Sequence, residues 1–339
     1  MSADATTPQH AVVTGGAGFL GSWLCERLLD LGWRVSCLDN LVTGSRSNVA
    51  HLLGNPRFDY RGADVTRELP VDDAQVDVVY HLASLASPVH YQRLPVETLL
   101  VGSSGTLNAL ELARRTGARL VLSSTSEVYG DPLEHPQTET YWGNVNPVGE
   151  RSMYDEAKRF SEALTMAFRR SSGVDTAIVR IFNTYGPRMA VDDGRMIPMF
   201  ISQALRGLPL TVTGDGSQTR SLCFVSDTID GLVAMAGATE PGPVNIGNPA
   251  ETTVSEVAAS IVARTGSDSM IEYVDGRPDD PQRRCPDIRR ARKALGWEPR
   301  VSWEEGLDAT LRWFADRLQR EPLASGSRLA PGVAGTPGS

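Results

Sequence analysis

Tyr154 and Lys158, in the segment YDEAK, stand four residues apart, so on a helix the two side chains share one face. A free tyrosine has a pKa of about 10, which is too high for a base at neutral pH. A neighbouring ammonium group favours the phenolate, and lowering the pKa to about 7 takes roughly 4 kcal/mol of differential interaction. The spacing indicates a tyrosine that removes a proton from a hydroxyl group. The alternatives are a surface Tyr–Lys pair and a core tyrosine.

A second group of reactive side chains ends an apolar segment upstream. In SSTSEVYGDP, Ser123–Thr125 close a predicted strand, so Thr125, Ser126 and Glu127 emerge at its carboxyl end, where open α/β sheets bind ligands. The Thr125 hydroxyl can hydrogen-bond the reacting hydroxyl group, and Glu127 can transfer a proton or hold a water molecule. The alternative for Glu127 is an ordinary cap on the next turn.

The elements that must position these side chains begin at a glycine-rich turn. The segment TGGAGFLGS places Gly15, Gly18 and Gly21 three residues apart, between a predicted strand at His10–Thr14 and a predicted helix at Phe19–Leu31. Glycine here permits a tight turn, close approach of the backbone to a pyrophosphate, and close packing of helix on strand. The helix N-terminus adds free N–H groups for the phosphates. The pattern predicts a dinucleotide-binding βαβ unit.

Asp39 indicates which dinucleotide is bound. It follows the predicted strand Arg34–Leu38, about twenty residues after the turn, where a carboxylate accepts hydrogen bonds from the adenosine ribose. That carboxylate repels a 2′-phosphate, which favours NAD over NADP, although Arg46 nearby leaves NADP open. The alternative is that Asp39 caps the turn DNLVTGS. The positive nicotinamide of NAD then joins Lys158 in favouring the phenolate of Tyr154.

Two further strand ends face the same region. Asp64 and Val65 end a third predicted strand and are expected near the adenine. His81 ends the strand Val76–Leu82 in the segment HLAS, whose backbone passes beside the cofactor. His81 could be a catalytic base, but a histidine packed at a strand end is the favoured interpretation.

The alternation of strands and helices continues to about residue 186. Strands are predicted at Arg119–Ser123 and Thr176–Phe182, and helices at Thr106–Arg114 and Tyr154–Arg170. This pattern predicts an α/β fold with a Rossmann-type, doubly wound parallel sheet. Beyond it, helices in PMFISQALRG and VSEVAASIVART alternate with short strands in PLTVTG and VNIG, which predicts a smaller α/β substrate-binding lobe. The expected domains are a disordered lead (1–9), an NAD-binding domain (10–186), mainly a nucleotide-sugar lobe (187–318) and a disordered tail (319–339).

Composition disfavours several classes of partner. The 339 residues are 41% hydrophobic and 22% charged, as in a globular enzyme. A formal net charge of −8 disfavours nucleic acid and anionic membranes. The scattered cysteines Cys25, Cys37, Cys223 and Cys285 form neither a disulfide framework nor a zinc site, so we expect no metal and a reducing compartment. With no signal-like start and no long apolar run, the expected location is the cytoplasm.

These segments together resemble a known family. TGGAGFLGS, DNLVTGS, HLAS, STSEVYGDP, YDEAKR, RIFNTYGPRM and DPQRRCPDI, with YWGNVNP before the YDEAK segment, are similar in order to the UDP-glucuronate decarboxylases (UDP-xylose synthases). These enzymes belong to the extended short-chain dehydrogenase/reductases, the NAD-dependent epimerase/dehydratase family. The resemblance runs from about His10 to Phe314.

The triplet after the strand separates this family from its relatives. The related dTDP-glucose 4,6-dehydratases typically read Thr-Asp-Glu, where Asp protonates a leaving hydroxyl, whereas this chain has Ser126 there. The UDP-glucose 4-epimerases typically carry a small residue where Glu127 stands. The resemblance therefore implies decarboxylation of UDP-glucuronate to UDP-xylose. An epimerase or dehydratase is the alternative enzyme, and an NAD-binding sensor or scaffold is a non-enzymatic one.

The resemblance also implies a redox-neutral mechanism. Tyr154 and NAD oxidise C4 of the sugar to a ketone, CO₂ leaves from C5, and hydride returns to C4. Glu127, with Ser126 and Arg284, is expected to manage the carboxylate and the C5 proton. The implied catalytic residues are Thr125, Ser126, Glu127, Tyr154 and Lys158. The expected cofactor residues are Gly15, Gly18, Phe19, Leu20, Gly21, Asp39, Asn40, Thr43, Gly44, Asp64, Val65, Leu82, Ser84, Tyr154 and Lys158. The expected substrate residues are Ser87, Asn183, Tyr185, Arg195, Thr211, Arg220 and Arg284.

The chain departs from the family pattern in two places. Family members usually read Lys-Thr-Asn where this chain has Leu100, Val101 and Gly102, and Leu85 replaces a common proline beside the sugar pocket. These changes are expected to alter cofactor retention or the sugar accepted. The resemblance further implies a homodimer through helices around 98–115 and 154–170.

Overall fold

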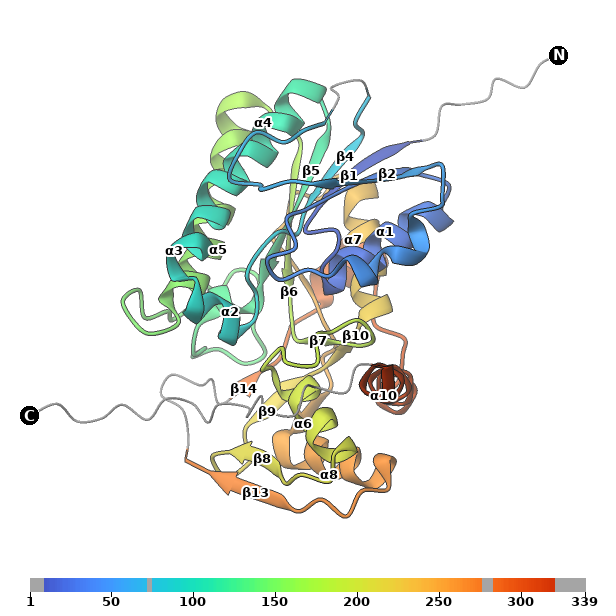
Figure 1. Ribbon diagram of the computed structural model, residues 1–339. Helices are drawn as coiled ribbons and strands as arrows, with labels where there is room; N and C mark the ends of the chain where they lie inside the picture. The colour runs from blue at the N-terminus through green and yellow to red at the C-terminus, as the bar shows by residue number, and fades with distance from the viewer. Residues whose placement is uncertain (1–8, 72–74, 276–282, 321–339) are drawn as a thin grey trace, which may run out of the picture.

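The computed structural model describes residues 9–71, 75–275 and 283–320. Its centre is a seven-stranded parallel sheet in the order β11-β6-β5-β4-β1-β2-β3 (Figure 1). Strand order reverses between β1 and β4, and ligands bind at such a switch point. The strands are β1 (His10–Thr14), β2 (Arg34–Asp39), β3 (Phe58–Gly62), β4 (Val78–His81), β5 (Arg119–Thr125), β6 (Thr176–Ile181) and β11 (Val244–Ile246).

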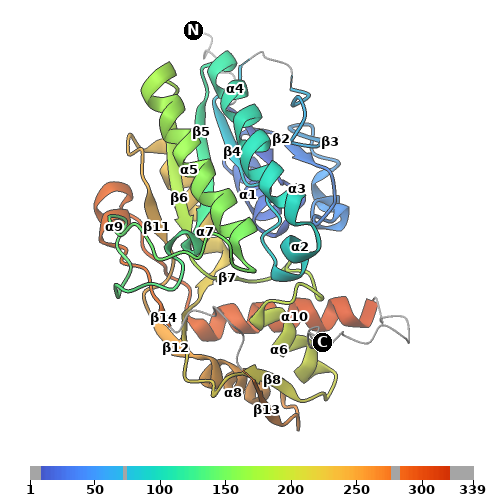
Figure 2. The ribbon, with the colours of Figure 1, turned by 90° about the vertical axis from the view of Figure 1, so that its left-hand side faces the viewer.

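Helices cover both faces of this sheet (Figure 2), so its central strands β1, β4 and β5 are buried along almost their whole length. α1 and α7 pack together on one face, while α3, α4 and α5 pack together on the other. α4 and α5 end where Gly117 and Gly173 adopt positive φ angles of 72° and 69°. The helices are α1 (Phe19–Asp30), α2 (Pro88–Arg93), α3 (Pro95–Leu100), α4 (Thr106–Thr116), α5 (Ser152–Ser172), α7 (Val225–Gly237) and α9 (Arg289–Leu295).

A smaller layer lies beyond the carboxyl edge of the sheet (Figure 1). It contains the three-stranded sheet β12-β9-β14 and the pairs β10-β7 and β13-β8. Its strands are β7 (Thr184–Tyr185), β8 (Leu210–Thr213), β9 (Thr219–Ser221), β10 (Cys223–Phe224), β12 (Glu251–Thr253), β13 (Ile271–Val274) and β14 (Arg283–Arg284). Its helices are α6 (Met196–Leu205), α8 (Val254–Thr265) and α10 (Trp303–Arg320).

The predicted Rossmann-type fold is confirmed, and β1 and α8 have the predicted bounds. One prediction is wrong: the strand in VNIG is not part of the second lobe. It is β11, which pairs in parallel with β6 at the edge of the main sheet, and α7 before it packs on α1. A short apolar strand carries no signal of the sheet it will join, because that choice depends on long-range pairing. The division into domains at residue 186 stays a prediction.

Three predictions involve the ends of the described segments. The expected disordered lead and tail fall mostly in 1–8 and 321–339, outside the described residues, as does the start of DPQRRCPDI at 280–282. Residues 319 and 320 belong to α10, so the expectation of disorder is wrong for these two positions. Among the described residues, no helix combines the length and the apolar character needed to cross a membrane.

Candidate active site

A cavity of about 1080 Å³ lies at the carboxyl edge of the sheet and extends over the switch point. The residues predicted to bind a cofactor and those predicted to be catalytic come together around it, as do three of the expected substrate residues. Its lining includes Gly15, Gly18, Phe19, Leu20, Gly21, Asp39, Asn40, Thr43, Gly44, Asp64, Val65, Leu82, Ser84, Ser87, Thr125, Ser126, Glu127, Tyr154, Lys158, Asn183 and Arg195.

The glycine turn forms one end of the cavity, and its geometry excludes side chains. Gly15 has a φ of +70°, and a Cβ there would lie 2.8 Å from the Ala83 backbone nitrogen. A Cβ on Gly21 would lie 2.1 Å from the Gly15 carbonyl oxygen. α1 begins at Phe19 directly after the turn, so its N-terminal N–H groups face the cavity. Bare backbone beside a helix N-terminus is the cradle that a diphosphate requires.

Asp39 lies at the end of β2, and its position is compatible with both roles considered from the sequence, a ribose-binding carboxylate and a turn cap. Its carboxylate accepts hydrogen bonds from the backbone nitrogens of Leu41 (2.8 Å) and Ala17 (3.0 Å), so it caps the turn. It also lines the cavity, and burial raises the pKa of its carboxyl group. The backbone bonds fix the position of a carboxylate that can still accept hydrogen bonds from ribose hydroxyls.

His81 is a packed histidine, as the favoured interpretation predicts. Its Nδ1 lies 2.8 Å from the Thr14 hydroxyl and its Nε2 lies 3.3 Å from the Thr106 hydroxyl. The side chain is buried, and burial lowers its pKa to about 3, helped by the charge of Lys158. The ring therefore stays neutral, and its hydrogen bonds connect β4 to β1 and α4.

Tyr154 and Lys158 lie on one buried face of α5, beside the end of β5. The Lys158 ammonium donates a hydrogen bond to the Ser123 carbonyl oxygen (2.7 Å), and burial lowers its pKa to about 8. Burial and the charge of Glu127 raise the pKa of Tyr154, although Thr125 acts in the opposite direction. In the polypeptide by itself, burial therefore outweighs the groups that lower the pKa of Tyr154. The expected lowering relies also on the positive nicotinamide of NAD and stays a prediction.

Two apolar contacts hold the tyrosine ring. Tyr91, on α2, stacks on Tyr154 with ring centroids 5.4 Å apart and planes 9° apart. Leu85, one of the expected departures from the family pattern, packs in the same buried cluster. Burial raises the pKa of Tyr91 to about 12, so it stays protonated. No sequence pattern marked Tyr91, since α2 is only six residues long.

Glu127 lies between two guanidinium groups. Arg284 approaches it with two nitrogens, of which Nη2 donates to Oε2 at 3.0 Å, and Arg151 Nη2 donates to Oε2 at 2.8 Å. Burial by itself would raise the pKa of this carboxyl group, but Arg284 and Arg151 outweigh burial and lower the pKa to about 2. Glu127 is thus a fixed anion. It is not the turn cap, because the Thr125 hydroxyl accepts the hydrogen bond from the Glu127 backbone nitrogen.

Arg151 and Asp155 are site residues that sequence reasoning missed. Arg151 directly precedes α5, three residues before Tyr154, and this i, i+3 spacing was the available signal. Asp155 is buried, and its Oδ1 has no hydrogen-bond partner among the described residues. Burial and the charge of Glu127 raise the pKa of its carboxyl group to about 7. The acidic and basic groups here therefore form one coupled cluster.

Four expected substrate residues do not line the cavity. Arg284 binds Glu127, and Arg220 is the register partner of Arg284 in the parallel pair β9–β14. Arg220 also helps to lower the pKa of Glu127. The expectation for Tyr185 is wrong, because its ring is buried in the core against Phe224 and Trp303, whereas the expectation for Thr211 stays a prediction. The Thr211 hydroxyl accepts a hydrogen bond from Gln203, because β8 directs it towards α6.

The unusual Gly102 is explained by helix packing. It lies in a short π-helical turn, Val101–Gly105, between α3 and α4. A Cβ there would lie 2.6 Å from the Cβ of Ala157, on α5, and the Gly102 carbonyl accepts a hydrogen bond from Ser161 (2.7 Å). The two segments therefore touch beside the Tyr154–Lys158 turn.

Comparisons with known proteins agree on a family. Residues 11–247 match the model of the NAD dependent epimerase/dehydratase family. UDP-glucuronic acid decarboxylase 6 of Arabidopsis thaliana is 52% identical over 91% of this chain and 89% of its own length. UDP-glucuronic acid decarboxylase 1 of Danio rerio is 49% identical over 92% of this chain and 74% of its own. The Bacillus cereus UDP-glucuronic acid 4-epimerase, in complex with UDP-glucuronic acid and NAD, has a TM-score of 0.82 at 26% identity, covering 91% of this chain and 100% of the epimerase.

Proposed function

Because this chain belongs to the NAD dependent epimerase/dehydratase family, we propose from its site that it is an NAD-dependent UDP-glucuronate decarboxylase that forms UDP-xylose. The observation that carries the proposal is the group of arginines around Glu127, next to Tyr154. A substrate with both a reactive hydroxyl group and a carboxylate suits this combination of a proton acceptor and cations.

NAD fits the residues that form the other end of the cavity. Gly15 and Gly21 leave the backbone bare for the diphosphate, and Asp39 is fixed where a ribose binds. When bound, NAD takes hydride from C4 of the sugar and returns it in the same turnover. The structure thus supports a resident cofactor with no external oxidant.

Tyr154 accepts the proton of the C4 hydroxyl while the C4 ketone forms. Its phenolate requires positive charge, and Lys158, one helical turn further, is the nearest ammonium group on the same buried face. The hydroxyl of Thr125 favours the deprotonated tyrosine as well. These three side chains lie together at the end of β5, where oxidation at C4 can occur.

Decarboxylation follows from the ketone itself. With a carbonyl at C4, the C6 carboxylate is β to it, so CO₂ leaves and its electron pair is delocalised into an enolate. Arg284 and Arg151 hold Glu127 as an anion, so its role is to accept hydrogen bonds from a water molecule or a sugar hydroxyl. Ser126 lies beside it in the cavity lining, and a water held by these two protonates C5.

A second copy of the chain is the proposed partner. Exposed apolar side chains lie on α3, α4 and α5: Val96 (62% exposed), Leu99 (43%), Leu107 (40%) and Phe160 (50%). Burying them against the same helices of a second protomer would remove this surface from water. All four cysteines are free thiols, which agrees with a reducing compartment such as the cytoplasm.

The test is to incubate the protein with UDP-glucuronate and substoichiometric NAD⁺, and to follow products by NMR and mass. UDP-xylose, CO₂ and no net NADH are expected. UDP-galacturonate without CO₂ would establish an epimerase instead. A 4-keto pentose with stoichiometric NADH would mean that hydride is not returned, and no turnover would remove the decarboxylase assignment.

A further inference from the structure

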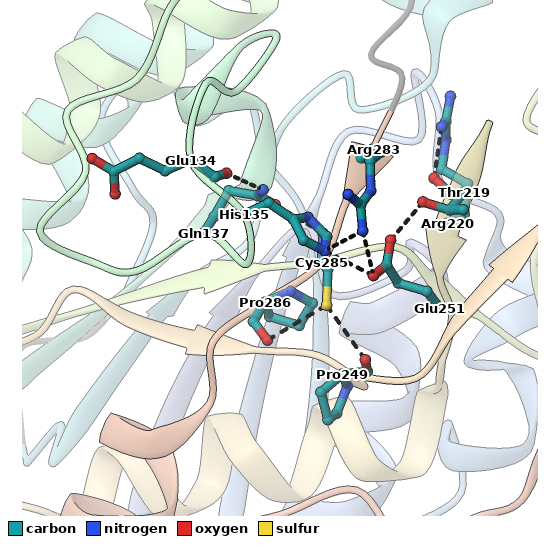
Figure 3. Close-up of polar contacts among 10 residues, drawn as sticks. All are labelled: Glu134, His135, Gln137, Thr219, Arg220, Pro249, Glu251, Arg283, Cys285 and Pro286. Carbon is teal, nitrogen blue, oxygen red and sulfur yellow. Dashed lines mark hydrogen bonds and ion pairs between the residues drawn. The ribbon is translucent and has the colours of Figure 1, made fainter.

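His135, Glu251 and Cys285 converge outside the active site (Figure 3). Their ligand atoms all lie within 4.8 Å of one another, and the His135 Nε2 is 2.8 Å from Oε2 of Glu251. His135 and Glu251 stand 116 positions apart in the sequence, and Cys285 lies further along the chain, so no sequence spacing marks them as a set. We propose that this cluster is a binding site for a zinc-like divalent cation.

The present hydrogen bonds of His135 are mutually inconsistent. The Arg283 Nη2 lies 2.7 Å from Nε2 of His135, the same nitrogen that faces Glu251. If Nε2 carries a proton, it opposes an N–H of Arg283, and if it carries a lone pair, it opposes the carboxylate. A cation that replaced the guanidinium would accept lone pairs from both His135 and Glu251. Arg283 can leave, because its side chain is 58% exposed.

The ligand atoms suit one class of ion. Nitrogen, sulfur and a single carboxylate oxygen favour Zn²⁺ or Co²⁺ over the oxygen-seeking Mg²⁺ and Ca²⁺. Tetrahedral zinc places its ligand atoms roughly 3.3–3.7 Å apart, which small side-chain movements here would achieve. Three protein ligands leave the fourth position for water. Binding releases the proton of the Cys285 thiol to solvent.

The surrounding structure holds these ligands in place. The Thr219 hydroxyl donates to Oε1 of Glu251 at 2.6 Å, which leaves Oε2 for an ion. Gln137 binds both backbone polar groups of Cys285, with its backbone nitrogen and its side-chain oxygen each at 2.8 Å. The Cys285 side chain is buried, whereas His135 borders a second cavity of about 630 Å³ that offers a path for an ion.

The experiment uses Co²⁺, since a cobalt–thiolate bond has a charge-transfer band in the near ultraviolet. Untagged protein is freed of metal with a chelator and titrated with Co²⁺ alone, and Zn²⁺ is then added. One Co²⁺ per chain, a thiolate band and displacement of Co²⁺ by Zn²⁺ are expected. Absence of the band, or its persistence in Cys285→Ser, would overturn the proposal.

Variants separate the site from folding and from general surface binding. His135→Asn should weaken Co²⁺ binding at least about 100-fold, and Thr219→Val about 10-fold. Arg283→Ala should tighten it roughly tenfold, because a competing charge is removed. His51→Asn is the matched control, since His51 also pairs with a carboxylate, that of Glu26. Equal effects of His51→Asn and His135→Asn would contradict the proposal. Metal binding is the readout, so failure of the decarboxylase assignment would leave this test unaffected.

Discussion

Arg284→Ala should destabilise the protein far more than the neighbouring substitution Arg283→Ala. Arg284 is 4% exposed and binds Glu127 with two nitrogens, whereas the Arg283 side chain is 58% exposed. The pKa of Glu127 falls from 4.5 to about 2, which corresponds to on the order of 3 kcal/mol favouring the ion, and Arg284 is the foremost cause of the lowering. Removing it leaves a buried carboxylate with less compensation, so a loss of about 3 kcal/mol is expected at pH 7. Arg283→Ala should cost under about 1 kcal/mol.

The assay is urea unfolding at pH 7 under chelating conditions, followed by a double-mutant cycle. Neutralising the carboxylate with Glu127→Gln in the Arg284→Ala background should cost less than it does in the wild type, with a coupling of at least about 2 kcal/mol. Because the folded pKa is lowered, this stability is present above about pH 4.5 and is lost as the pH falls through about 2. Equal losses for Arg284→Ala and Arg283→Ala, with no coupling, would refute the reasoning.

Further predictions concern α5 and its neighbours. Tyr154→Phe should reduce UDP-xylose formation at least about 1000-fold with little change in melting temperature, and an active variant would remove its role as base. Gly102→Asn should lower the free energy of unfolding by about 1–3 kcal/mol, because the new side chain collides with Ala157. Adding Ala157→Gly should restore part of that stability, measured by urea unfolding. The pKa of the Asp155 carboxyl group is raised from 3.8 to about 7 in the folded protein. Ionised Asp155 therefore destabilises the folded protein, and this loss of stability grows as the pH rises from about 4 to 7. Asp155→Asn should therefore gain stability over the wild type above pH 7 and not at pH 4. Phe160→Asp should give monomers by light scattering if α5 forms the dimer interface.

Local patterns predicted the geometry of the glycine turn and of the Tyr154 helix. The turn at Gly15 is a contiguous segment, and its conformation follows from close backbone approaches that exclude a Cβ. Tyr154 and Lys158 are likewise fixed by helical spacing on α5. His81 could be interpreted correctly because a strand-end histidine is more often packed than catalytic. In each case the information lies within a few residues of the chain.

Long-range pairing explains where prediction was incomplete or wrong. Tyr185 lies near the motif residues in sequence, yet β7 pairs with β10 and directs its ring into the core. Thr211 faces Gln203 for a similar reason. Arg284, which contacts Glu127, lies on β14, and β14 is positioned by its pairing with β9. Sequence spacing does not indicate which strands will pair with one another.

The sequence by itself determined the fold class, the glycine turn and the pairing of Tyr154 with Lys158, because backbone conformation and helical period are local properties. Only the tertiary structure decided the charge of Glu127, since its pKa depends on burial and on arginines from two distant segments. It also raised the pKa of Tyr154 through burial and brought His135, Glu251 and Cys285 together. Electrostatic energies depend on distance and solvent exposure, and both are set when remote segments pack.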